Sequence, residues 1–396
     1  MSQSFASRTY TFLLWSVNLC AISASTLSYI YLSYYIYTQT ENLLYSQTVL
    51  FAPMILPVLL VAPIYRLADR LAPRTLLWGA NVLSLGSALV TYLLLPHQPW
   101  VAIVGAVLIG TLDAVQRVGR IVAIKCYFPG AQIASSVPLT LTAQFIAGGL
   151  AGISMLLFKA SMSPNVALMV TATLFLIAAL AAFVLPTLTV PPAAHAPTRL
   201  IPALSELIRS APALRQRLYQ FILFVSLFQG FFNVSRVLLP AHELGLGESG
   251  VGMLQAVNSV AALVGAIVFY RLAKRDIHPS PTTMTIISSL FMAIAAYAFN
   301  VESSYLSYFF YIFFFELAFF RLQAELVSHT PAHAMPLMAS VQYAGVYLGM
   351  IITIFIGSLL VEWIGLLQTA LIFACTYYIA TYLVRLDISV SDKAPA

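Results

Sequence analysis

The stretch YRLADR at Tyr65–Arg70 returns 205 positions later as YRLAKR at Tyr270–Arg275. Each copy follows a long apolar run and precedes another one. Self-similarity at matching places along a chain is the sequence signature of an internal repeat. The sequence therefore predicts two related halves, each with a basic hinge loop.

The composition excludes a soluble fold. Hydrophobic residues make up 61% of the 396 residues, charged residues only 8%, and the mean hydropathy is +0.91. Such a chain cannot cover a single core with a charged surface, so we predict an all-α membrane protein. Twelve apolar runs are long enough to cross a bilayer and suggest two pseudo-symmetric six-helix halves. They lie near residues 10–37, 44–64, 75–95, 100–124, 133–158, 164–186, 218–240, 250–270, 282–300, 304–327, 335–360 and 364–385.

The halves are predicted to be residues 1–186 and 218–396, joined by a cytoplasmic linker at residues 187–217. Three prolines make the first part of this linker extended. Its second part, residues 200–218, mixes arginines with leucines and isoleucine. Two interpretations stay open for it: an amphipathic segment on the membrane surface, or a solvated linker.

Basic residues are distributed unevenly between the predicted loops. If both termini face the cytoplasm, fourteen of the nineteen Lys and Arg residues lie in inside loops and tails, and only Lys159 lies outside. Cytoplasmic loops carry such an excess. We therefore predict a multi-pass protein of a bacterial-type inner (plasma) membrane with both termini cytoplasmic. The net charge of +6 is then explained by the basic residues of the cytoplasmic loops and does not indicate a nucleic-acid partner.

Seven ionisable residues lie inside the predicted spans. A charge at mid-bilayer costs at least about 2.5 kcal/mol, so such groups normally face a cavity or a partner. They are confined to the fourth, seventh and tenth spans, while the first span is rich in uncharged polar residues. This pattern predicts that spans one, four, seven and ten line a shared cavity. The seven residues are Asp113, Arg117, Arg120, Arg236, Glu316, Arg321 and Glu325.

Two of the carboxylates are predicted proton carriers. Asp113 and Glu316 each lie near the middle of a span, and an arginine follows each of them by four or five residues. A buried carboxyl exchanges its proton when its hydration or its pairing changes. Four intramembrane arginines against three acids favour an anionic or zwitterionic solute. The predicted substrate contacts are Arg117, Arg236, Gln229, Asn233, Tyr29 and Arg321.

Structural roles compete with these interpretations. Asp113 with Arg117, and Arg321 with Glu325, could be static ion pairs that hold helices in register. Arg120 and Glu325 lie near the cytoplasmic ends of their spans and could extend their charged ends to the interface. Arg236 lies toward the outer face, where basic residues are disfavoured, and this position favours a role in the cavity.

Residues 65–74 resemble the loop motif G-x-L-a-D-r-x-G-r-[KR] of the major facilitator superfamily. They lack both of its glycines. The resemblance implies twelve spans in a six plus six arrangement, similar to drug and siderophore efflux members. It also implies that Asp69 contacts the neighbouring half and stabilises an outward-facing state. The residues expected to govern conformational change are Asp69, Arg70, Arg74, Arg120 and Glu325.

Other chemistries find no support in the sequence. There is no P-loop, the three cysteines and six histidines have no metal-ligand spacing, and no catalytic constellation is present. We therefore expect no enzyme activity, no metal and no cofactor. The leading hypothesis is a monomeric, proton-coupled exporter of a small amphipathic or anionic compound that works by alternating access. An importer or facilitator of an organic anion, and a membrane-embedded sensor, are the alternatives.

Overall fold

The computed structural model describes residues 2–40, 43–128, 130–158, 163–188 and 200–391. The described residues form helices and connections, with no strand among them. A π-helical turn at Leu239–Glu243 and a short 3-10 turn at Ala332–Ala334 interrupt the series. The α-helices are α1 (Ser2–Thr40), α2 (Leu43–Leu59), α3 (Val61–Arg70), α4 (Pro73–Leu94), α5 (Val101–Tyr127), α6 (Gly130–Phe158), α7 (Pro164–Val184), α8 (Leu200–Ser210), α9 (Pro212–Leu238), α10 (Gly247–Lys274), α11 (Pro281–Ala296), α12 (Val301–His329), α13 (Met335–Ile364) and α14 (Leu366–Ser391).

The prediction of a twelve-span helical membrane protein is confirmed. Within the described residues, nine helices are long and apolar enough to cross a membrane, and the bent pair α2 and α3 adds a tenth. Shorter apolar helices at Ser136–Leu150 and Pro281–Ala296 complete the twelve. Each of the twelve predicted apolar runs lies on one of these helices or on the bent pair. In lipid the backbone must satisfy its own hydrogen bonds, which leaves the helix as the only form for such runs.

The prediction of a hinge loop at Tyr65–Arg70 is wrong, because this stretch is helical. It forms most of α3, which is bent by 67° from the preceding helical segment. Pro63 explains the bend, since a proline lacks the amide proton that would bond to the carbonyl four residues earlier and its ring clashes there. The second copy, Tyr270–Arg275, likewise continues α10 up to Lys274.

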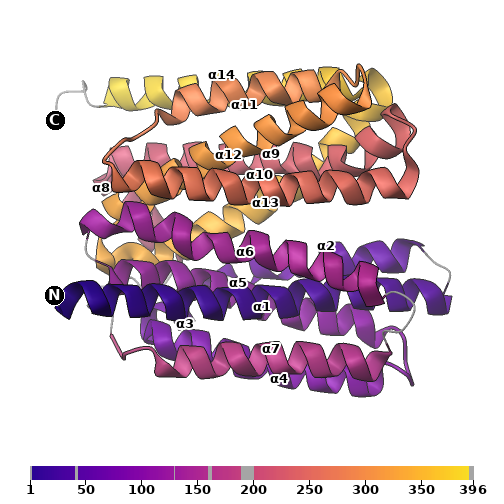
Figure 1. The fold of residues 1–396 in the computed structure, drawn as a ribbon. Coiled ribbons are helices and arrows are strands. Elements are labelled where there is room, and N and C mark those ends of the chain that lie inside the picture. Colours follow the sequence, from indigo (N-terminus) through magenta and orange to yellow (C-terminus); the bar gives the residue numbers. More distant parts are fainter. Residues whose placement is uncertain (1, 41–42, 129, 159–162, 189–199, 392–396) are drawn as a thin grey trace. The chain divides into compact units, whose positions relative to one another are not determined.

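The chain divides into two compact units, which we describe separately. The first comprises residues 1–200 and 331–344, and the second comprises residues 201–330 and 345–396. Within each unit the long helices run side by side along a common direction (Figure 1). The predicted halves and their linker stay predictions. Residues 189–199 of that linker lie outside the described residues, and α8 occupies its next eleven positions.

Each unit has its own apolar core. In the first unit, α1 packs against α6 and α7, and α4 packs against α5 and α7. Tyr31, Tyr92 and Phe175 are the large side chains at the centre of that core. In the second unit, α12 packs against α9, α10 and α11. There Phe224 contacts Phe228 and Phe315 with ring centroids 4.9 Å apart in both pairs.

Candidate functional site

The first intramembrane cluster lies on α5. The Nε atom of Arg117 donates to the Oδ2 atom of Asp113 at 2.7 Å, one helical turn away. The Asp113 residue is buried, with 6% of its surface exposed, whereas the Arg117 side chain is 26% exposed. The pair is therefore closed on the carboxylate side and partly open on the guanidinium side. The ion pair between these two residues, one of the two interpretations of the sequence, is present.

Arg120 lies one turn further along α5 and makes different contacts. Its Nη1 atom donates to the Oδ1 atom of Asn18 on α1 at 2.5 Å, and its Nη2 atom donates to the hydroxyl of Tyr343 at 3.1 Å. Tyr343 belongs to the part of α13 that is assigned to the first unit. Only 2% of the Arg120 surface is exposed. Of the two interpretations that the sequence left open for Arg120, this burial disfavours extension to the interface, because the charged end is enclosed by neighbouring helices.

Asn18 holds this arginine in place. The Asn18 Nδ2 atom donates to the main-chain oxygen of Thr140 on α6 at 2.9 Å, so the amide oxygen is turned toward Arg120. One turn before Asn18, the indole nitrogen of Trp15 donates to the hydroxyl of Thr142 at 3.0 Å. Two hydrogen bonds between α1 and α6 therefore fix the position of Asn18, which accepts from Arg120.

Glu316 on α12 is the second buried carboxylate of the spans, and its surroundings differ from those of Asp113. The residue is 6% exposed, and its Oε2 atom is buried without a hydrogen-bond partner among the described residues. A Cβ atom added to Gly265 on α10 would lie 3.1 Å from the Glu316 Cβ atom. Glu316 thus lies where α12 closely approaches α10. Gly265 permits this close approach because it has no side chain.

The expected equivalence of Asp113 and Glu316 is therefore not found in their pairing. Arg321 follows Glu316 by five residues, but its Nε atom contacts the Oε1 atom of Glu325 at 2.6 Å. Within a helix, residues four apart face each other, whereas residues five apart do not. The ion pair of Arg321 with Glu325, which the sequence left open, is present.

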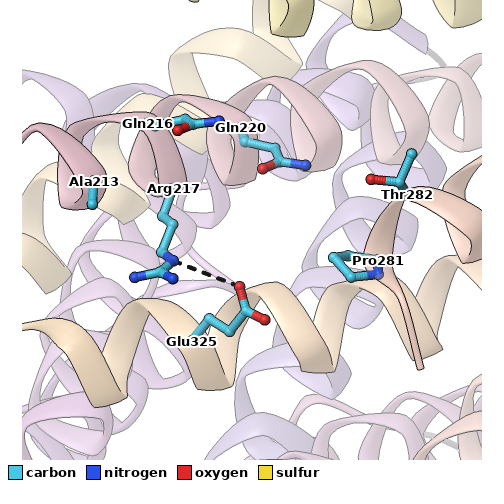
Figure 2. A pocket seen from close by; sticks show the side chains of 7 residues that line it. All are labelled: Ala213, Gln216, Arg217, Gln220, Pro281, Thr282 and Glu325. Atoms are coloured by element: carbon cyan, nitrogen blue, oxygen red, sulfur yellow. Dashed lines mark ion pairs between the residues drawn. The ribbon is translucent and has the colours of Figure 1, made fainter. Parts of the chain in front are cut away.

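Glu325 also joins α12 to α9. Its Oε2 atom lies 3.6 Å from the Nε atom of Arg217, as Figure 2 shows. The two side chains line an open pocket of about 220 Å³ at the ends of these helices. Glu325 is thus shared by two arginines and does not simply extend to the interface. The pocket residues are Ala213, Gln216, Arg217 and Gln220 of α9, Pro281 and Thr282 of α11, and Glu325.

The predicted polar stripe of α9 is only partly available for a ligand. The Nδ2 atom of Asn233 donates to the main-chain oxygen of Gln229 at 2.9 Å, which occupies the side-chain amide within its own helix. Gln229 is exposed within the second unit, and Arg236 is half-buried. The Arg236 guanidinium lies 6.0 Å from the centre of the Phe232 ring, and no acid pairs with it among the described residues.

The remaining sequence candidates lie away from these charges. Tyr29 packs against the apolar core of the first unit. Arg74 donates to the Thr187 hydroxyl at 2.9 Å and lies over the Phe183 ring at 4.6 Å, which fastens α4 to the end of α7. Asp69 and Arg70 lie in the last turn of α3, where Asp69 is half-buried and Arg70 is exposed. Their expected part in conformational change stays a prediction.

Sequence reasoning missed three residues that complete the surroundings of Arg120, namely Asn18, Thr140 and Tyr343. Asn18 has a recognisable signal, because an asparagine in an apolar span needs a partner. Thr140 and Tyr343 have none, since threonine and tyrosine are common in such helices. No cluster of metal-ligating side chains occurs within the described ranges.

The family model described as Major Facilitator Superfamily matches residues 14–322. A search of curated proteins gave no match. Among solved structures, the human organic anion transporter MFSD10 is 14% identical, with a TM-score of 0.76 over 96% of this chain and 99% of that one. The fucose:proton symporter FucP of E. coli is 15% identical, with a TM-score of 0.74 over 95% and 98%.

A bacterial homologue of the iron transporter ferroportin, solved in an outward-facing state, is also similar. It is 13% identical, with a TM-score of 0.75 over 96% of this chain and 99% of that one. At these levels of identity the three structures share the fold with this chain. Whatever they transport is a property of those proteins.

Proposed function

Because this chain belongs to the Major Facilitator Superfamily of transporters, we propose that it is a proton-coupled secondary transporter that exports a small amphipathic or anionic compound. A drug-like natural product or a siderophore is the expected kind of substrate. The protein would work as a monomer by alternating access. The excess of basic residues in one set of loops supports an inner-membrane location with both termini in the cytoplasm.

The observation that carries proton coupling is the isolation of Glu316. The buried Oε2 atom of Glu316 has no hydrogen-bond donor among the described residues, and a buried charge without such a partner is costly, so the neutral acid is the form that suits the closed contact between α10 and α12. Opening of that contact to water would allow the proton to leave. A group whose protonation follows its hydration can couple a proton gradient to a conformational change.

Asp113 is the less favoured proton carrier. Its carboxylate has the Arg117 guanidinium at 2.7 Å, which stabilises the charged form in place. The anionic character of the substrate is supported by the basic side chains on α5 and α9, and the similarity to a human organic anion transporter agrees with it.

The test of proton coupling is transport into proteoliposomes with and without an imposed pH gradient. The compounds would be labelled carboxylates, siderophores and cationic drugs, and the variant Glu316→Gln mimics the protonated acid. We expect wild type to move an anionic compound against its gradient. For one proton per solute, a gradient of about one pH unit supports at most roughly tenfold accumulation. The variant should lose this accumulation and keep solute exchange without a gradient.

Glu302→Gln is the matched control, because Glu302 is an exposed residue in the first turn of the same helix. It should behave as wild type. Accumulation that persists in Glu316→Gln and disappears in Asp113→Asn would show that Asp113, and not Glu316, carries the proton. The orientation of the gradient that drives accumulation distinguishes export from import of an organic anion, which is the alternative. Absence of movement for every compound would contradict the transporter proposal.

A further inference from the structure

The inference concerns one edge of the Arg120 guanidinium. The Nε and Nη2 atoms form the edge that can bind both oxygens of a carboxylate at once. In the structure this edge is only half used: Nη2 donates to the Tyr343 hydroxyl, whereas Nε is buried without a hydrogen-bond partner among the described residues. The Nη1 atom on the other side is held by Asn18. A buried hydrogen-bond donor is therefore left unsatisfied on the edge that suits a planar anion.

Arg120 also differs from Arg117, Arg217 and Arg321 in having no acidic partner among the described residues. Arg236 lacks such a partner too, but it is only half-buried. Arg117 has Asp113, while Arg217 and Arg321 share Glu325. Its hydrogen-bond partners Asn18 and Tyr343 are both neutral, although only 2% of the Arg120 surface is exposed. A buried cation normally has an anionic partner, because removal of its hydration is otherwise uncompensated. The missing counter-charge points to an anion from outside the chain.

A second unsatisfied donor lies in the same network. The Thr140 hydroxyl is buried without a hydrogen-bond partner in the part of the chain that the structure describes, and the main-chain oxygen of the same residue accepts from the Asn18 amide that holds Arg120. Arginine and a hydroxyl group together suit a carboxylate better than a neutral or cationic group. The contacts of Asn18 prearrange the guanidinium before any ligand arrives, which reduces the cost of binding.

We propose that the Nε and Nη2 edge of Arg120 binds the carboxylate of the transported compound, with Thr140 as a further donor. The Tyr343 hydroxyl occupies half of that edge in the structure and gives way when the anion binds. This inference rests on the proposed transport function and names the chemical group that the substrate presents. It also makes Arg120 a binding residue, whereas the sequence suggested a role in conformational change.

The experiment measures equilibrium binding, so it does not depend on transport. Purified protein in lipid nanodiscs is titrated with benzoate, hexanoate and citrate, and with the neutral analogues benzamide and hexanamide. The readout is the shift in the unfolding midpoint. We expect at least one carboxylate to stabilise wild type while its amide does not. Arg120→Lys keeps the charge but loses the two-nitrogen edge, and should weaken binding at least tenfold. Arg275→Lys, at an exposed position, is the matched control.

Tyr343→Phe separates a binding role from a structural one. Removal of the competing hydroxyl frees Nη2, so the variant should bind the carboxylate several-fold more tightly than wild type. If Arg120 only holds helices together, Tyr343→Phe should leave binding unchanged or weaken it. The inference is overturned if no carboxylate stabilises wild type, if amides bind equally well, or if Arg120→Lys binds as wild type does.

The two proposals can fail separately. A protein that binds carboxylates through Arg120 but moves nothing under a pH gradient would refute the transport proposal and retain the anion site. A protein that transports normally in the Arg120→Lys variant would refute the anion site and retain the transport proposal.

Discussion

Replacement of Gly110 by alanine should disturb the packing of α5 against α2, one turn before Asp113. A Cβ atom at this position would lie 2.8 Å from the Pro53 Cα atom and closer still to the Pro53 Cβ atom. Neither the backbone nor the proline ring can rotate away, so α2 must shift by roughly half an ångström or more. Overpacking of this kind costs about 1–3 kcal/mol. Alanine recovers up to about 1 kcal/mol through its higher helix propensity. With the full propensity gain subtracted, we therefore expect a net loss of up to about 2 kcal/mol.

The assay is denaturant unfolding of the purified protein in detergent, with Gly86→Ala on α4 as the matched control. Nothing lies within 4 Å of a Cβ atom added at Gly86, so only the helix-propensity gain remains there. The control should therefore be slightly more stable than wild type, by about 0.5–1 kcal/mol. If Gly110→Ala proves as stable as Gly86→Ala, the close approach of α2 and α5 is not a rigid contact, and this reasoning is refuted.

Two further predictions concern the ion pairs. Asp113→Asn should destabilise the protein by about 1–3 kcal/mol because Arg117 loses its carboxylate, and Asp113→Asn combined with Arg117→Gln should recover part of this loss. Additive losses in the unfolding free energies would argue against coupling between the two residues. Glu325→Gln should cost less than about 1 kcal/mol, since the side chains of its ion pairs are 20–28% exposed. Amide exchange at the α9 and α12 ends near Arg217 should accelerate, and unchanged exchange would contradict the joining role of Glu325.

The helical fold could be predicted from composition and from the lengths of apolar runs. In a bilayer the backbone has no water to bond to, so a run of twenty apolar residues has a single outcome. The prediction of a loop at Tyr65–Arg70 was wrong for a reason that lies in the local sequence. Charged residues suggested a connection, but two or three charges on one face of a short helix are compatible with an amphipathic helix at the end of a span. Pro63 bends the chain without ending the helical conformation.

The pairing of charges was predictable only where it is local. Asp113 with Arg117 and Arg321 with Glu325 are each four residues apart, and helical geometry brings such residues together in any fold. Glu316 was expected to behave like Asp113 because both precede an arginine. Because Arg321 follows Glu316 by five residues, its side chain faces away from Glu316. It precedes Glu325 by four residues and therefore faces that carboxylate.

The sequence by itself determined that this chain crosses a membrane with twelve helices and that its charges gather on three of them. These properties follow from composition and from helical periodicity, which depend on neighbours along the chain. Only the tertiary structure decided that Arg120 meets Asn18 and Tyr343, 102 and 223 positions away, and that the buried Oε2 atom of Glu316 has no hydrogen-bond partner among the described residues. The physical reason is that a buried charge is stabilised or left isolated by side chains from other helices, and the packing of those helices sets which ones come within reach.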